Sequence, residues 1–144
     1  MVRQAKSTTE QSDESTPAAL PVIDLVRPLL GFPDARRFSL EHLDATGVLA
    51  ELRGIDRADL KFLTVPAGTF YPDFAPEIDD ETASALEITA INDVQVLLIV
   101  HTGPTLTSTT VNLRAPLIIN TTAGLGAQVI IDDPRLAVDA PLLG

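Results

Sequence analysis

The chain of 144 residues contains no cysteine and no tryptophan, and aromatic residues amount to only 4% of it. Without cysteine there is no disulfide framework, no thiolate metal site and no cysteine nucleophile. The two histidines are too few for a zinc site made of three histidines, so we expect neither a metal nor a cofactor. Hydrophobic residues make up 45% of the chain, and the scarcity of rings means that the core consists mainly of Leu, Ile, Val and Ala.

Long apolar runs are lacking as well. The longest, 94–100, is interrupted by Gln95 and is much too short to cross a bilayer. The N-terminus has no apolar signal core, so we expect a cytoplasmic protein. Residues 1–19 are rich in Ser and Thr and have almost no bulky apolar side chains, which predicts a disordered tail followed by one domain over 20–144.

Basic residues are scarce: 10 Lys and Arg stand against 20 Asp and Glu, which gives a net charge of −10. Such a surface repels phosphate, so it argues against direct binding of nucleic acid or anionic lipid and is compatible with a basic protein partner. Between Lys61 and Arg114 there is no Lys or Arg, and the acids there are Asp73, Glu77, Asp79, Asp80, Glu81, Glu87 and Asp93. This interval predicts one acidic surface region, which serves either solubility or the attraction of a basic partner.

Short apolar segments bounded by turn residues begin at residue 20, a pattern typical of β-strands. The predicted strands are 22–26, 37–43, 48–52, 60–65, 94–101, 107–120 and 128–131. The last three are joined by short turns and predict a meander. The expected fold class is therefore mainly β, a small antiparallel β-barrel-like domain or a sandwich, with one or two short helices.

The middle of the chain departs from the strand pattern. Residues 66–76 contain three prolines around three aromatic rings, which predicts an ordered but irregular loop. Asp79 or Asp80 is expected to cap a short helix that runs through Leu86.

Pro116 interrupts the β-branched stretch 107–120. Because proline cannot donate to a strand ladder, it predicts an edge position or a bulge. Asn112 and Asn120 flank this point, and Gln128 lies beyond the next turn. Their amides are expected to satisfy backbone groups that a bulge leaves unpaired, with direct contact to a partner as the alternative.

Catalytic and metal-binding patterns are weak. His101 ends an apolar strand and is interpreted as a satisfied or solvent-edge histidine. His42 with Asp44 is only half of a metal site, and the acids at 79–81 lack the alternation and central glycine of a calcium loop. No serine has the flanking glycines of a nucleophile elbow. We therefore expect no enzyme; the alternative is a barrel hydrolase or carbohydrate-binding protein whose paired carboxylates meet only in space.

Residues 110–120 read Thr-Val-Asn-Leu-Arg-Ala-Pro-Leu-Ile-Ile-Asn. This motif resembles the signature T-x-N-L-x-A-P-[ILV]-x-[IV]-N of the FliW family of flagellar assembly factors. The Gln-Val-Ile-Ile of 128–131 is similar to the strand that follows this signature. The Gly-Phe-Pro-Asp-Ala-Arg-Arg-Phe of 31–38 is similar to an early family motif, and 62–74 resembles its proline–aromatic–Asp–aromatic loop. The similarity runs from about 22 to 142.

The resemblance implies a compact barrel and two protein partners in the cytoplasm, flagellin and the translational regulator CsrA. Members of the family bind newly made flagellin and antagonise CsrA, which relieves repression of flagellin synthesis without any catalytic step. Flagellin that occupies the factor leaves CsrA free, and secretion of flagellin frees the factor. We expect the unbound protein to be a monomer that binds neither nucleic acid nor membrane directly.

The candidate partner-binding residues lie in and near the acidic interval. The expected rim for CsrA consists of Asp73, Glu77, Asp79, Asp80 and Glu81. A ring left exposed among Phe70, Tyr71 and Phe74 is expected to anchor flagellin or CsrA, with burial under the loop as the alternative. Arg114 is expected either to pair with a carboxylate or to contact a partner.

Deletion of residues 1–19 is expected to leave the melting temperature nearly unchanged, because a tail of this composition contributes no packing. Differential scanning calorimetry of the full chain and of the truncated chain measures the difference. A large drop in the melting temperature would mean that the tail is docked on the domain.

Overall fold

Four strands form the first wall of the molecule, and each pairs antiparallel with the next. They are β1 (Val22–Arg27), β2 (Arg37–His42), β3 (Ala50–Gly54) and β4 (Lys61–Pro66). The computed structural model describes residues 22–90 and 93–142, so the tail predicted at 1–19 lies outside the described residues. Along β2, Phe38 and Leu40 are buried while Arg37 is exposed, because successive side chains of a strand face opposite sides.

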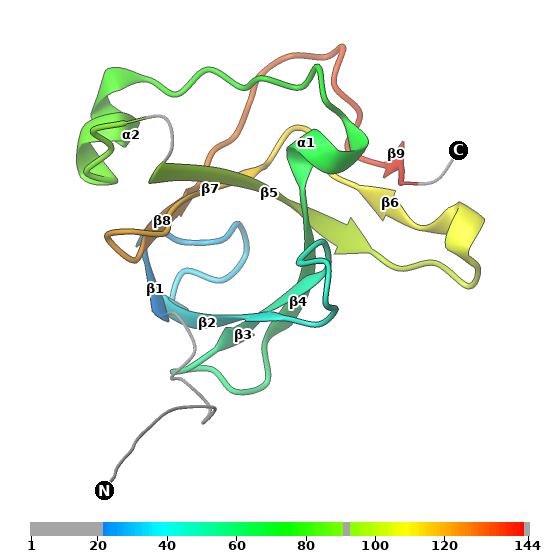
Figure 1. The fold of residues 1–144 in the computed structure, drawn as a ribbon, viewed down its shortest axis with the longest axis horizontal. Coiled ribbons are helices and arrows are strands. Elements are labelled where there is room, and N and C mark those ends of the chain that lie inside the picture. The colour runs from blue at the N-terminus through cyan, green and yellow to red at the C-terminus, as the bar shows by residue number, and fades with distance from the viewer. Residues whose placement is uncertain (1–21, 91–92, 143–144) are drawn as a thin grey trace, which may run out of the picture.

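The second wall closes a barrel. It consists of β5 (Val94–His101), β7 (Leu117–Asn120) and β8 (Leu125–Gln128). Because β5 pairs with β4 and β8 pairs with β1, seven strands form a closed ring (Figure 1). The predicted barrel is confirmed, but the β1–β8 pair is parallel. A ring of seven strands cannot alternate in direction all the way round, so one parallel pair is unavoidable.

Aliphatic side chains fill the barrel interior, as the composition predicts. Phe38, Leu52, Leu97 and Leu117 are among the fully buried members of this cluster. The loop 28–36 folds across the ring of strands (Figure 1) and adds Leu29 and Ala35 to the same core. The barrel is therefore a packed core and not an open channel.

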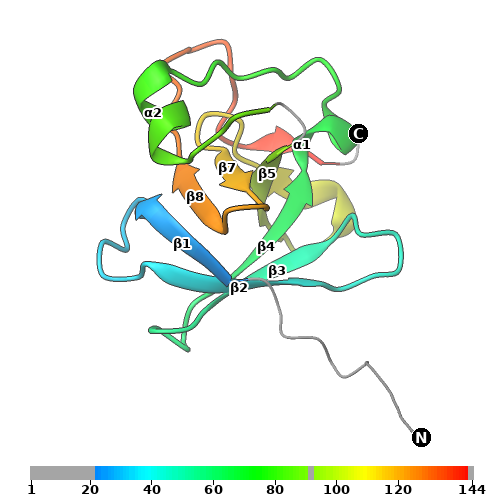
Figure 2. The same ribbon diagram turned by 60° about the vertical axis from the view of Figure 1, so that its left-hand side comes forward.

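Two smaller clusters cover the outside of the barrel. Helix α1 (Ala67–Phe70) and the loop after it pack over Val65 and Leu98, on β4 and β5. Leu86, which follows helix α2 (Asp80–Ala85), packs over Ile118 and Ala127, on β7 and β8. Figure 2 shows α2 beside β8 and α1 at the end of β4. Among the described residues, neither helix nor any other is long and apolar enough to cross a membrane.

Helix α1 lies inside the stretch 66–76, where the sequence predicts an irregular loop, so that prediction is wrong at this point. The backbone of Pro66 has φ −64° and precedes the first helical residue, Ala67. Proline is tolerated where a helix begins, because the first turn does not need its N–H.

The predicted cap of α2 is confirmed at Asp79. Its carboxylate accepts a hydrogen bond from the backbone N–H of Thr82 at 2.7 Å. Hydrogen bonding from Thr82 lowers the pKa of Asp79. Because the pKa is lowered on folding, this cap stabilises the protein above the unfolded pKa and is lost as the pH falls through the folded one.

The predicted strand 107–120 is divided. A single turn of 3₁₀ helix, η2 (Leu106–Ser108), is followed by β6 (Thr110–Val111) and then by β7. Both strands pair with the same edge of β5: Val111 lies opposite Val100, and Leu117 lies opposite Leu97. The five residues 112–116 between the two pairings therefore lie opposite only two residues of β5, Leu98 and Ile99. The bulge predicted from Pro116 is confirmed. A short strand that was not predicted, β9 (Ala140–Pro141), pairs with β6.

The last predicted strand is shifted, since β8 ends at Gln128 where 128–131 had been predicted to begin. The sequence assigns both Gly124 and Gly126 to a turn, but only Gly124 has a positive φ, of 71°. Gly126 belongs to β8, where an added Cβ would lie 2.9 Å from the Ile23 side chain. Its role is close packing of β8 against β1, which local sequence does not reveal.

Asn120 joins α2 to the barrel and is only 2% exposed. Its Nδ2 donates to the carbonyl oxygens of Leu86 at 2.8 Å and Glu87 at 3.1 Å. Its Oδ1 accepts from the backbone N–H groups of Thr122 at 3.0 Å and Ala123 at 3.1 Å. One buried amide therefore satisfies the end of α2 and the β7–β8 turn together.

We expect Asn120→Ala to lower the free energy of unfolding by about 2–3 kcal/mol, because buried backbone groups lose their partners. Urea denaturation monitored by circular dichroism measures this change. Asn112→Ala is the matched control, since its half-buried Oδ1 accepts only the N–H of Arg114, at 2.9 Å. Equal losses in the two variants would contradict the assignment of this role to Asn120.

Candidate functional site

The negative charge is concentrated in one part of the molecule. Residues 62–142 contain ten acidic and two basic side chains, whereas 22–61 contain seven acidic and six basic ones. Residues 62–142 form the helices, the second wall and the C-terminal segment, whereas 22–61 form most of the β1–β4 wall. In Figure 2 the helices lie in the upper part of the molecule and β1–β3 in the lower part. The two bases of the acidic part are Arg114 and Arg135.

A groove lies in this acidic part, between the loop 70–77 and the segment 131–136. It has a volume of about 620 Å³, and a hollow of about 430 Å³ continues it past Glu77 and Ile131. We call the two together the loop groove. The predicted partner-binding residues that line it are Phe70, Tyr71, Asp73, Phe74, Glu77 and Asp79. Asp80 and Glu81 are exposed on the first turn of α2 and do not line it.

The three rings of the loop form the floor of the loop groove. Phe70, Tyr71 and Phe74 are half-buried and pack against the outer cluster over β4 and β5. The Tyr71 hydroxyl donates to the carbonyl oxygen of Pro141, and burial raises the pKa of Tyr71. Each ring is thus anchored in the fold and also lines the groove.

The charged side chains at the groove differ in their pairing. Asp73 and Glu77 are exposed, and neither forms an ion pair within residues 22–90 and 93–142. Asp133 receives two hydrogen bonds from the Arg135 guanidinium, at 2.9 and 3.1 Å, and one from the Arg135 backbone N–H at 3.0 Å, and these bonds lower the pKa of Asp133. Because Arg135 is the only base that lines the groove, its lining carries an excess of negative charge.

Arg114 holds the far wall of the groove in place. Its Nε donates to the carbonyl oxygen of Leu136 at 2.6 Å, and an Nη donates to that of Pro134 at 3.1 Å. The carboxylate pairing expected from the sequence is replaced by these backbone contacts. Direct contact between Arg114 and a partner stays a prediction.

The far wall of the groove was not predicted as part of a site. Its members include Leu113, Ile131, Asp133 and Leu136. In the sequence, 132–134 indicates only a strand end and a turn. No local signal places this segment beside a loop that comes much earlier in the chain.

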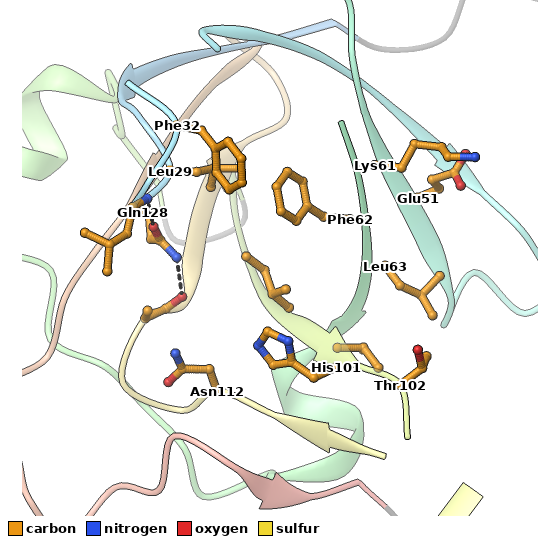
Figure 3. Close-up of a pocket in the computed structure, with 14 residues that line it drawn as sticks. Leu29, Phe32, Glu51, Lys61, Phe62, Leu63, His101, Thr102, Asn112 and Gln128 are labelled. Atoms are coloured by element: carbon orange, nitrogen blue, oxygen red, sulfur yellow. Dashed lines mark hydrogen bonds between the residues drawn. The ribbon is translucent and has the colours of Figure 1, made fainter. Parts of the chain in front are cut away.

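A second pocket, the barrel-mouth pocket, has a volume of about 680 Å³. Phe32 and Phe62 lie next to each other in its upper part, with His101 and Asn112 below them (Figure 3). The rings of Phe32 and Phe62 form an edge-to-face pair with centroids 5.5 Å apart. The residues come from several separate segments, so sequence reasoning identified no site here.

Gln128 closes one side of the barrel-mouth pocket. Its Oε1 accepts from the N–H of Leu30 at 2.6 Å, and its Nε2 donates to the carbonyl oxygen of Ala115 at 3.3 Å (Figure 3). Both hydrogen bonds of the Gln128 side-chain amide are thus made with backbone groups. The same holds for Asn112, whose Oδ1 accepts from the Arg114 N–H.

The His and acidic side chains of the described residues do not assemble a metal centre. Over 22–90 and 93–142, no three His, Asp or Glu side chains are grouped so as to hold a metal ion. Asp44 instead accepts the N–H groups of Val48 and Leu49 in the loop after β2. The carboxyl groups with shifted pKa values are Asp44, Asp59, Asp79 and Asp133, and all four shift downward.

The fold and the two hollows define a small closed-barrel protein with open surface clefts suited to binding. The FliW protein family model matches residues 5–142. The chain therefore belongs to the FliW family of flagellar assembly factors, and the resemblance found in the sequence is confirmed.

Individual relatives agree with this assignment. The flagellar assembly factor FliW of Clostridioides difficile (strain 630) is 29% identical over 121 residues, which cover 84% of this chain and 93% of the relative. That of Desulfitobacterium hafniense (strain DSM 10664 / DCB-2) is 34% identical over 108 residues, covering 75% and 71%. A crystal structure of the flagellar assembly factor FliW matches with a TM-score of 0.80 and 26% identity, covering 86% of each chain.

Proposed function

We propose that this flagellar assembly factor binds flagellin in the cytoplasm and antagonises the regulator CsrA, which relieves repression of flagellin synthesis. The observation that carries the proposal is the loop groove, an apolar cleft with unpaired Asp73 and Glu77 in the acidic part of the molecule. Its apolar floor offers contact area, and its charge favours a basic partner. No step of this function requires catalysis.

The acidic field has a specific use against an RNA-binding partner. It attracts the basic surface of CsrA and raises the association rate. Once bound, it opposes the approach of RNA phosphates to the same neighbourhood. Flagellin that occupies the factor removes it from CsrA by mass action, so the level of unsecreted flagellin sets the amount of free CsrA.

The purified protein is expected to form a defined complex with its cognate flagellin and with its cognate CsrA. Size-exclusion chromatography with light scattering detects each complex by co-elution and gives its mass. Adding flagellin to the CsrA complex is expected to release CsrA. Separate elution of all three proteins at micromolar concentrations would contradict the proposal.

We expect charge reversal at Asp80 and Glu81 to lower the CsrA association rate by about tenfold at low salt, because steering depends on the local field. Asp79 is left unchanged since its carboxylate caps α2. Stopped-flow association at rising NaCl is expected to show the difference shrinking, as the Debye length falls to ~10 Å at 0.1 M.

The matched control is Asp34→Lys with Glu41→Lys, two exposed acids of the β1–β4 side that give the same change in net charge. Its association rate is expected to stay close to that of the original protein. Equal slowing by both double variants would mean that total charge acts and that α2 is not at the interface.

A further inference from the structure

We propose that the loop groove receives an extended segment of a protein partner in which apolar side chains are flanked by lysine or arginine. The inference rests on the proposed function, because it takes the groove as the place where a partner binds. It adds the chemistry of the bound segment and the part of the fold that pairs with it.

The floor of the groove selects apolar side chains. Phe70, Phe74, Leu113 and Leu136 line the larger part, and Ile130, which is 59% exposed, lines the adjoining hollow. Covering such surface favours binding, because it removes apolar area from water. The volumes of about 620 and 430 Å³ lie in the range of ordinary binding pockets, roughly 300–1,000 Å³.

The charges around this floor select basic neighbours. Four carboxylates line the groove, those of Asp73, Glu77, Asp79 and Asp133, against the single guanidinium of Arg135. An acidic segment would place like charges together in a partly desolvated site, and a neutral segment would leave the unpaired acids without partners. Lysine or arginine beside the apolar residues satisfies both requirements.

The backbone at the groove favours an extended segment. The N–H of Val129 donates to Pro116 at 3.0 Å and that of Ile131 donates to Arg114 at 2.7 Å, so this stretch continues the β7–β8 ladder. Because successive N–H groups of a strand point in opposite directions, the N–H of Ile130 points away from β7. It has no partner among the described residues. The neighbouring strand β1 has already ended at Arg27. An extended segment that lies beside Ile130 can accept a main-chain hydrogen bond from this N–H.

Three fluorescein-labelled synthetic peptides of equal length test the chemistry by fluorescence anisotropy on the full chain. One alternates Lys and Leu, one Lys and Ser, and one Glu and Leu. The Lys–Leu peptide is expected to bind at least about tenfold more tightly than the Lys–Ser peptide, and the Glu–Leu peptide not to saturate. Equal binding of the Lys–Leu and Lys–Ser peptides, or saturation by the Glu–Leu peptide, would overturn the proposal.

Variants of exposed charges test the location without disturbing the core. Asp73→Lys with Glu77→Lys is expected to weaken the Lys–Leu peptide by about tenfold, whereas Asp34→Lys with Glu41→Lys is expected to bind it with an affinity close to that of the original protein. Arg135→Gln is expected to strengthen binding, because it leaves the Asp133 carboxylate unpaired. Equal weakening by the two double variants would overturn the assignment to the groove.

Amide chemical shifts of the ¹⁵N-labelled protein locate the bound Lys–Leu peptide directly. Perturbations are expected at 70–79 and 129–136, and perturbations centred on the barrel-mouth pocket would overturn the proposal. Peptide binding at the groove without co-elution of flagellin or CsrA would keep this inference and remove the proposed partners. Complexes with flagellin or CsrA that leave the groove amides unperturbed would keep the proposed partners and overturn the assignment of the groove as the binding site.

Discussion

The bulge at 112–116 is the constraint on which both hollows of the molecule depend. Five residues face two on β5, and Pro116 has no N–H to offer to the ladder. Backbone groups freed by this mismatch are satisfied from nearby: Gln128 donates to Ala115, and Asn112 accepts from Arg114. Hydrogen bonding with the chain that continues β8 begins at Pro116, whose carbonyl oxygen accepts from the N–H of Val129. These bonds offset part of the cost that such a distortion has in a regular sheet.

The same bulge separates the two hollows. Asn112 and Ala115 line the barrel-mouth pocket, while Leu113 lines the loop groove. Between them, the Arg114 guanidinium binds the carbonyl oxygens of 134 and 136 and keeps the far wall of the groove in position. Arg114 behind this wall and Arg135, paired to Asp133, both keep their positive charge, but the four carboxylates that line the groove outnumber them.

Local chemistry explains which elements are predictable from the sequence. The strand over 94–101 and the Asp79 cap of α2 match the structure, because alternating β-branched residues and a side-chain cap act within a few residues. The prolines of 66–76 indicate a loop, but Pro66 is compatible with the beginning of helix α1. The position of β8 differs from the prediction because Gly126 serves close packing against Ile23 and not a turn. The first difference is a matter of local turn chemistry, and the second depends on a neighbour far away in the chain.

The sequence by itself determined the acidic balance, the aliphatic core, the interval without bases between Lys61 and Arg114 and the family of the protein. These properties depend on composition and on short motifs, which need no knowledge of the fold. Only the tertiary structure decided that loop 70–77 lies against 131–136 and that β1 pairs in parallel with β8. Those contacts join segments far apart in the chain, and they follow from barrel closure and from the bulge, which no local pattern of residues records.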